Sequence, residues 1–310
     1  MKYAPILLAS GLASLISGTA LAGGLGALVT PAELAAASAE APVILDIRAK
    51  GFTDGHIAGA VSAPYGLFRG PADNPGAVPP VDKLEATYES LGLDPARPVV
   101  IVSQGDTDTD FGAAARVYWT LKSSGFTELS VLNGGQIAWV NAGLPISTIA
   151  GTPTPTELSI AWNPSWTADT SAVADIVEGK SEAVLVDARP AAFFEGKKAH
   201  EAAARPGTLP GAENLPYTEF FRAGATAIDV QSDVSALKTR LGISANEEVV
   251  SFCNTGHWAA TDWFALSELA GIENVKLYPG SMVEYSKTEG EMANQPGILD
   301  NLLNQITGTN

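Results

Sequence analysis

Cysteine is almost absent from this sequence, which has one, Cys253, in 310 residues. An internal disulfide needs two cysteines, so no disulfide framework supports the fold. Histidine is also scarce, with three residues and no His-x-x-x-His spacing, and we expect no metal site. No cofactor is expected either, since no nucleotide-binding glycine motif lies between a strand and a helix. Two interpretations of Cys253 are open, an inert buried residue and a free reactive thiol.

Positive charge is in short supply as well. Lys and Arg total 18 against 34 Asp and Glu, which gives a formal net charge of -16 at pH 7. Without a basic stripe, the composition argues against nucleic acid and anionic membrane surfaces as partners. An anionic substrate also receives no long-range attraction from the chain as a whole.

Long apolar runs are missing beyond the N-terminus, where residues 1–22 have the pattern of a cleaved signal peptide. Lys2 precedes an apolar stretch, and Ala20-Leu21-Ala22 fits a small-x-small cleavage site. A membrane anchor is the alternative, but the stretch is short for a span and is interrupted by serine and glycine. We therefore expect export to a periplasm, with no membrane contact after cleavage.

The order of expected elements repeats once along the chain. An apolar strand ending in Asp-x-Arg occurs at 43–48 and again at 184–189. A second apolar strand at 99–102 is matched by one at 249–252. The period is that of a domain, and in both halves strands alternate with helices. Each half is therefore expected to be an α/β domain, a doubly wound parallel sheet with helices on both faces.

The boundary between the halves is marked by residues 147–160, which contain Thr-Pro-Thr-Pro and no apolar period. Such a composition is typical of a linker. The sequence thus predicts one domain at 29–146 and a second at 161–310.

Cys253 opens a polar loop that runs to Trp258, between the strand at 249–252 and a helix. In doubly wound sheets the functional loops lie at the carboxyl ends of strands. Amides of such a loop and of the helix start would favour a thiolate, so we expect N–H groups to converge on the sulfur. Gly256 suits a position with positive φ or close backbone approach, and Thr255 offers a hydroxyl donor.

These features together resemble the tandem-domain rhodaneses, the thiosulfate and 3-mercaptopyruvate sulfurtransferases, in an exported bacterial form. The motifs are Asp-x-Arg in both halves, Gly55-His56-Ile57-Ala58-Gly59-Ala60, the Cys-x-x-Gly loop at Cys253, and Gly-Gly-x-x-x-Trp at 134–139. The resemblance covers nearly all of the mature chain. It implies two rhodanese-like domains, of which 29–146 is inactive and 161–310 is catalytic.

The first half has no cysteine where the second has Cys253. Residues 103–110 follow the corresponding strand and carry three aspartates. This segment can form no persulfide, and its charge would repel an anion. We interpret the first domain as a scaffold that covers one side of the active site.

The predicted activity is transfer of sulfane sulfur from thiosulfate or 3-mercaptopyruvate to cyanide or a thiol, through a persulfide on Cys253. The partners are thus a small sulfur donor and a nucleophilic acceptor, with a thiol redox protein as a further candidate. A non-catalytic sulfur carrier or persulfide-binding protein is the alternative from another functional class. A rhodanese-fold phosphatase is weaker, because its Cys-x5-Arg loop would need arginine where Ala259 stands.

The other loop residues have open roles. His257 either hydrogen-bonds the leaving group, or charges beside the thiolate, or is a solvent-facing or helix-capping histidine. Trp258 either walls the pocket or belongs to the core. Asn254 is expected to shape the loop. Asp187 and Arg189 are expected to form a structural ion pair that braces the loop, because the same pair recurs in the cysteine-free half.

The loop departs from the thiosulfate-using rhodaneses, which have basic residues in the loop and a second arginine after Asp-x-Arg. Here Asn254 and Thr255 are neutral, and Phe193 stands where that arginine would fall. Arg205 is the candidate for replacement anion binding. Lys197 and Lys198 are weaker candidates, for which surface solvation is the alternative.

Overall fold

The computed structural model describes residues 24–37, 42–229, 234–244 and 246–297. The predicted signal peptide at 1–22 therefore lies outside the described residues. Within them, no helix is long and apolar enough to cross a membrane. The same residues contain no group of three or more His, Cys, Asp or Glu side chains placed to hold a metal ion.

The first domain is built on a five-stranded parallel sheet with the order β1-β6-β5-β2-β4. These strands are Leu28–Val29, Leu129–Leu132, Val99–Val102, Val43–Asp46 and Val61–Ser62. A small antiparallel pair, β3 (His56–Ile57) with β7 (Ile146–Ser147), lies outside this sheet. Its helices are α1 (Pro31–Ala36), α2 (Val81–Ser90), α3 (Thr109–Ser123) and α4 (Gly135–Asn141), with a 3-10 turn, η2 (Tyr65–Phe68).

Helices cover both faces of this sheet, as its central strand shows. In β5, Val99 and Ile101 belong to the same core cluster as side chains of α2 and α3. Val100 and Val102 point to the other face, where they join Leu34 of α1 and Trp139 of α4. Both faces are apolar because a parallel strand covered on two sides has no solvated side.

The second domain repeats this plan with a four-stranded parallel sheet of order β11-β10-β8-β9. The strands are Val275–Leu277, Val249–Phe252, Val184–Asp187 and Glu213–Asn214. Its helices are α5 (Thr170–Val177), α6 (Ala191–Phe194), α7 (Val234–Arg240), α8 (Trp258–Phe264) and α9 (Ser281–Tyr285), with shorter turns η3 (Pro164–Trp166) and η4 (Tyr217–Phe220). A π-helical turn, η5 (Ala265–Leu269), continues α8. The predicted fold class, two α/β domains with parallel sheets between helices, is confirmed.

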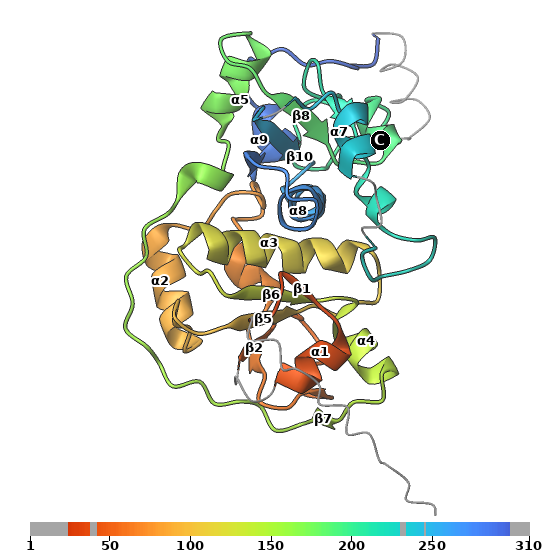
Figure 1. The fold of residues 1–310 in the computed structure, drawn as a ribbon. Coiled ribbons are helices and arrows are strands. Elements are labelled where there is room, and N and C mark those ends of the chain that lie inside the picture. The colour runs from red at the N-terminus through yellow and green to blue at the C-terminus, as the bar shows by residue number, and fades with distance from the viewer. Residues whose placement is uncertain (1–23, 38–41, 230–233, 245, 298–310) are drawn as a thin grey trace, which may run out of the picture.

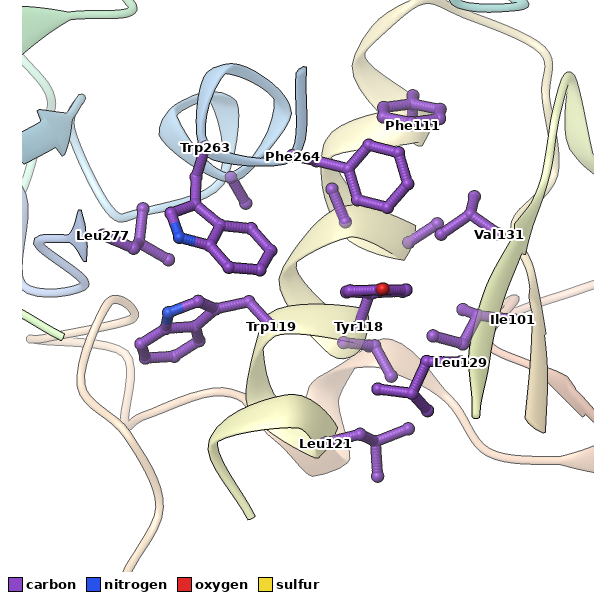
Figure 2. Packing of buried hydrophobic residues seen from close by; sticks show 14 of the residues in the cluster. Ile101, Phe111, Tyr118, Trp119, Leu121, Leu129, Val131, Trp263, Phe264 and Leu277 are labelled. Carbon is purple, nitrogen blue, oxygen red and sulfur yellow. The ribbon is translucent and has the colours of Figure 1, made fainter. Parts of the chain in front are cut away.

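The two domains share one core, in which α3 lies against α8 (Figure 1). Figure 2 shows Tyr118 and Phe111 of α3 beside Phe264 of α8, with Ile101 and Val131 of the first sheet on the other side. The ring centroids of Tyr118 and Phe264 are 5.0 Å apart in an edge-to-face arrangement. Because α3 is covered by its own sheet and by the other domain, it is buried on nearly all sides.

Polar contacts also join the domains along α3. Tyr118 donates to Glu268 at 2.8 Å, and Lys122 pairs with the same carboxylate at 2.8 Å. The indole of Trp119 donates to the backbone oxygen of Trp166 at 2.7 Å. Ser147, the first residue of the predicted linker at 147–160, belongs to β7. Residues 148–160 run along the edge of the molecule without a helix or strand (Figure 1).

Candidate active site

Cys253 follows β10 directly and is 1% exposed. The loop that it opens, with Asn254, Thr255 and Gly256, is buried as well. Gly256 has a φ of 65°, and a Cβ there would lie 2.3 Å from the Arg116 guanidinium and 2.6 Å from the Pro279 oxygen. Glycine is required here on both grounds, conformation and space.

Ser281, in the first turn of α9, holds the two ends of this loop. Its hydroxyl accepts the N–H of Cys253 at 3.0 Å and the N–H of Gly256 at 3.1 Å, and donates to the Tyr278 oxygen at 2.8 Å. Two amides that were expected to face the sulfur are thus bonded to a serine instead. Ser281 adopts a φ of 50°, in the left-handed region that non-glycine residues rarely occupy.

The outer side of the loop is bound by two arginines of the first domain. Arg69 donates from Nη1 to the Thr255 oxygen at 2.9 Å. Arg116, on α3, donates from Nη1 to the Gly256 oxygen at 3.3 Å. The first domain therefore contributes cations to the cysteine loop, although it has no cysteine of its own.

His257 links the same loop to the first domain. Its Nε2 donates to the backbone carbonyl oxygen of Thr109 at 2.9 Å, and its Nδ1 accepts from the Tyr65 hydroxyl at 3.1 Å. We assign this tautomer because a carbonyl oxygen only accepts. Burial lowers the pKa of His257 to about 3, with the Arg69 charge as the second cause. The ring is therefore neutral at physiological pH, which does not favour a histidine that charges beside the thiolate.

Trp258 belongs to an aromatic group at the start of α8. Its ring stacks on Tyr217 with centroids 5.2 Å apart and meets Phe193 edge-on at 5.8 Å. Its indole N–H donates to the Thr109 hydroxyl at 2.8 Å, and the Tyr217 hydroxyl donates to Asp108 at 3.3 Å. Phe193, which stands where an arginine was expected, thus packs on an aromatic wall.

Asp187 and Arg189 form a buried ion pair at 2.6 Å. Arg189 also donates from Nη1 to the Asn254 amide oxygen at 3.3 Å, so the pair bears on the residue after Cys253. The first domain contains the same arrangement, in which Arg48 pairs with Asp46 at 2.7 Å and reaches Gln104 at 3.4 Å. An arrangement present in both halves points to a brace for the loop rather than to chemistry.

Arg205 is held by backbone oxygens. It donates to Ser286 at 3.0 Å from Nε, and to Thr288 at 2.8 Å and Gly290 at 3.0 Å from Nη2. These hydrogen bonds hold the chain that follows α9. Lys197 and Lys198 are both exposed.

Sequence reasoning overlooked Ser281, Arg69 and Arg116. Ser281 follows the segment matched to 125–134 in the repeat, where the first half has Gly135 with a φ of 60°. A serine in the place of a left-handed glycine was a usable signal. A lone arginine in the apolar run of α3 was another.

A cysteine loop at the carboxyl end of a parallel strand, set between two copies of one α/β domain, defines the structural class. The Rhodanese-like domain family matches residues 30–142 and 169–288. The chain belongs to this family.

Relatives of the chain include sulfurtransferases and a sulfur carrier. The thiosulfate sulfurtransferase of Azotobacter vinelandii is 28% identical, with 83% of this chain and 93% of that protein covered. The 3-mercaptopyruvate sulfurtransferase of Escherichia coli K12 is 28% identical over 76% of this chain and 82% of its own. A sulfur carrier protein of Thermus thermophilus is 28% identical over 65% of this chain and 72% of that protein. The crystal structure of SseA from Escherichia coli superposes with a TM-score of 0.71, covering 83% of this chain and 99% of that one at 24% identity.

The first prediction concerns Ser281. Replacement by alanine leaves two buried N–H groups without their acceptor, so we expect Ser281→Ala to lower the free energy of unfolding by about 1–3 kcal/mol in urea titrations. Ser62→Ala, at an exposed position, is the control and should change it by less than about 0.5 kcal/mol. Equal urea midpoints for Ser281→Ala and the wild type would contradict the assigned role.

The second prediction concerns His257 and acid stability. A histidine whose folded pKa is depressed stabilises the fold above its unfolded value of roughly 6.5, and this stability is lost as pH falls toward the folded value. The folded pKa is about 3, so the loss extends down to that pH. Its slope is at most about 1.4 kcal/mol per pH unit.

In His257→Gln this part of the acid loss should vanish. Urea titrations of both proteins at a series of pH values from neutral downward measure it, because the carboxylates titrate alike in both. A stability difference that stays constant over the whole window would count against a neutral, buried His257.

Proposed function

We propose that the protein is a sulfurtransferase that carries sulfane sulfur on Cys253. The observation that supports this best is the setting of the sole thiol. Cys253 follows a central strand, in a loop held by two arginines of the first domain. A thiolate is the common side chain that is both soft and ionisable near neutral pH, as this chemistry needs.

The cycle has two steps. The Cys253 thiolate attacks the outer sulfur of thiosulfate, the S–S bond of the donor breaks, and sulfite leaves with the bonding electron pair. Cyanide or a thiolate then attacks the outer sulfur of the persulfide, which releases thiocyanate or a new persulfide and restores the Cys253 thiolate. With 3-mercaptopyruvate, the C–S bond breaks instead and the carbon takes up a proton to give pyruvate.

Both donors are retained in the proposal. Relatives of each kind resemble the chain equally at 28% identity. Phe193 occupies the position of the second arginine expected of a thiosulfate binder, and its ring packs against Trp258. The acceptor is a small nucleophile or a thiol redox protein.

The third prediction is that the wild-type protein gains one sulfur atom on Cys253 after exposure to thiosulfate or to 3-mercaptopyruvate. Mass spectrometry of the intact protein and of its peptides, with the two donors in parallel, identifies the donor class. Cyanide should remove the added sulfur as thiocyanate. Cys253→Ser is the control and should gain nothing. Thiocyanate production by Cys253→Ser, or no sulfur gain from either donor, contradicts the proposal.

A non-catalytic sulfur carrier is the second candidate, which the similarity to the Thermus thermophilus carrier supports. Turnover separates the two functions. Many thiocyanate molecules per protein in the presence of excess donor and cyanide indicate an enzyme, whereas a single equivalent indicates a carrier.

We also propose that the protein is exported to a periplasm, on the strength of the N-terminal pattern. The fourth prediction is that the mature chain begins at Gly23. N-terminal sequencing of the protein recovered from a periplasmic extract tests it, and recovery of the intact Met1 terminus from the membrane fraction would contradict it.

A further inference from the structure

We propose that the cysteine-free domain supplies the positive charge of the active site. Arg116 and Arg69 are positioning residues that hold the Cys253 loop by its carbonyls and stabilise its sulfur anion across the domain interface. The inference rests on the proposed function, since it takes Cys253 as the nucleophile.

Arg116 is a completely buried cation with no carboxylate partner in the described residues. Its Nη2 donates to the Gly76 oxygen at 2.8 Å and its Nη1 to Gly256, while Nε has no acceptor in the part of the chain that the structure describes. Its guanidinium carbon lies 4.8 Å from the ring centroid of Trp119. A buried charge of this kind is costly unless an anion compensates it.

Burial lowers the pKa of Arg116 to about 9, and the Arg69 charge adds to this, so the side chain is still a cation near neutral pH. The negative charges of Tyr65 and Cys253, when ionised, raise the pKa of Arg116. Of these two, the cysteine is the more acidic group by type. Cys253 opens the loop whose Gly256 oxygen Arg116 binds, and in this proposal its thiolate or persulfide compensates the buried cation.

Arg69 acts on the neighbouring carbonyl of the loop. It lies in the long loop between η2 and α2, with its guanidinium carbon 5.2 Å from the ring centroid of Tyr65. A peptide unit is planar and trans, so its carbonyl and the next N–H point in opposite directions. Since the Thr255 oxygen is bonded to Arg69, the Gly256 N–H turns the other way, onto Ser281. The loop is thus held from two sides, by the arginines and by the serine.

Burial favours the neutral form of three other titratable groups near the cysteine loop. Burial raises the pKa of Tyr65, and burial lowers that of His257 to about 3. Asp262, on α8, is fully buried with neither carboxylate oxygen bonded in the described residues. Burial raises the pKa of Asp262 well above its usual range, and the negative charge of Cys253 adds to this. Burial and the charge of Cys253 thus both favour the neutral form of Asp262.

Two further charges, Asp187 and Arg189, cancel in their ion pair. Among the described residues, Arg69 and Arg116 are the cations that donate to backbone carbonyls of the cysteine loop. Neither forms an ion pair with a carboxylate in that part of the chain. The loop itself has no basic residues, and the first domain supplies Arg69 and Arg116 in their place.

The fifth prediction tests this with the full-length protein. The rate of Cys253 alkylation by iodoacetamide, measured against pH, gives the pKa of the thiol. In Arg116→Met and in Arg69→Met we expect the midpoint of this profile to rise by roughly one pH unit, and the rate at neutral pH to fall up to about tenfold. Above the new midpoint, the rates of variant and wild type should converge, because the thiol is then ionised in both.

Lys122→Met is the matched control. Lys122 lies on the same helix as Arg116, pairs with Glu268 of the other domain and contacts two tryptophan rings, but it does not touch the cysteine loop. Its midpoint should equal that of the wild type. An equal shift in Lys122→Met would mean that a loosened interface, rather than charge, moves the thiol, and the inference would be wrong.

The outcomes separate this inference from the proposed function. If Arg116→Met does not fold, Arg69→Met decides, because that side chain is only partly buried. An unchanged midpoint in the folded arginine variants overturns the inference and leaves the function standing. A wild-type Cys253 that iodoacetamide never modifies overturns the proposed function itself.

Discussion

The packing of α3 against α8 is the interaction on which the rest of the structure depends. It merges the apolar faces of two domains into one core. It also brings polar groups of the first domain to the cysteine loop of the second. Thr109 and Arg116 lie on α3, and both hydrogen-bond to that loop or to the residues that follow it. Because α3 lies between its own sheet and α8, residues of both domains contact the cysteine loop.

Duplication explains why the two halves share a frame and differ in chemistry. Each half keeps a buried ion pair at the end of a central strand, Asp46 with Arg48 and Asp187 with Arg189. The frame is retained because an unpaired charge at such a site would be strongly destabilising. The corresponding loop of the first half has no thiol. Its helix α3 instead contributes Thr109 and Arg116, which hydrogen-bond to the cysteine loop of the second half.

Four strands, the linker and both ion pairs were predictable, because each depends on residues close together in the chain. These strands lie at 43–46, 99–102, 184–187 and 249–252. Apolar runs of four residues ending in Asp indicate buried parallel strands without knowledge of the partner strand. The loop was recognisable for the same reason, since strand, cysteine and glycine follow one another. Residues such as Arg116 and Ser281 were not, because their partners lie 140 and 25–28 positions away.

The sequence by itself determined the fold class, the duplication and the position of the single thiol, since these follow from local pattern and from the count of cysteines. Only the tertiary structure decided what surrounds that thiol. The neutral state of His257, the serine under the loop and the arginines on its carbonyls arise from contacts between distant segments. Burial then shifts the pKa values of those segments, raising that of Asp262 and lowering that of Arg116.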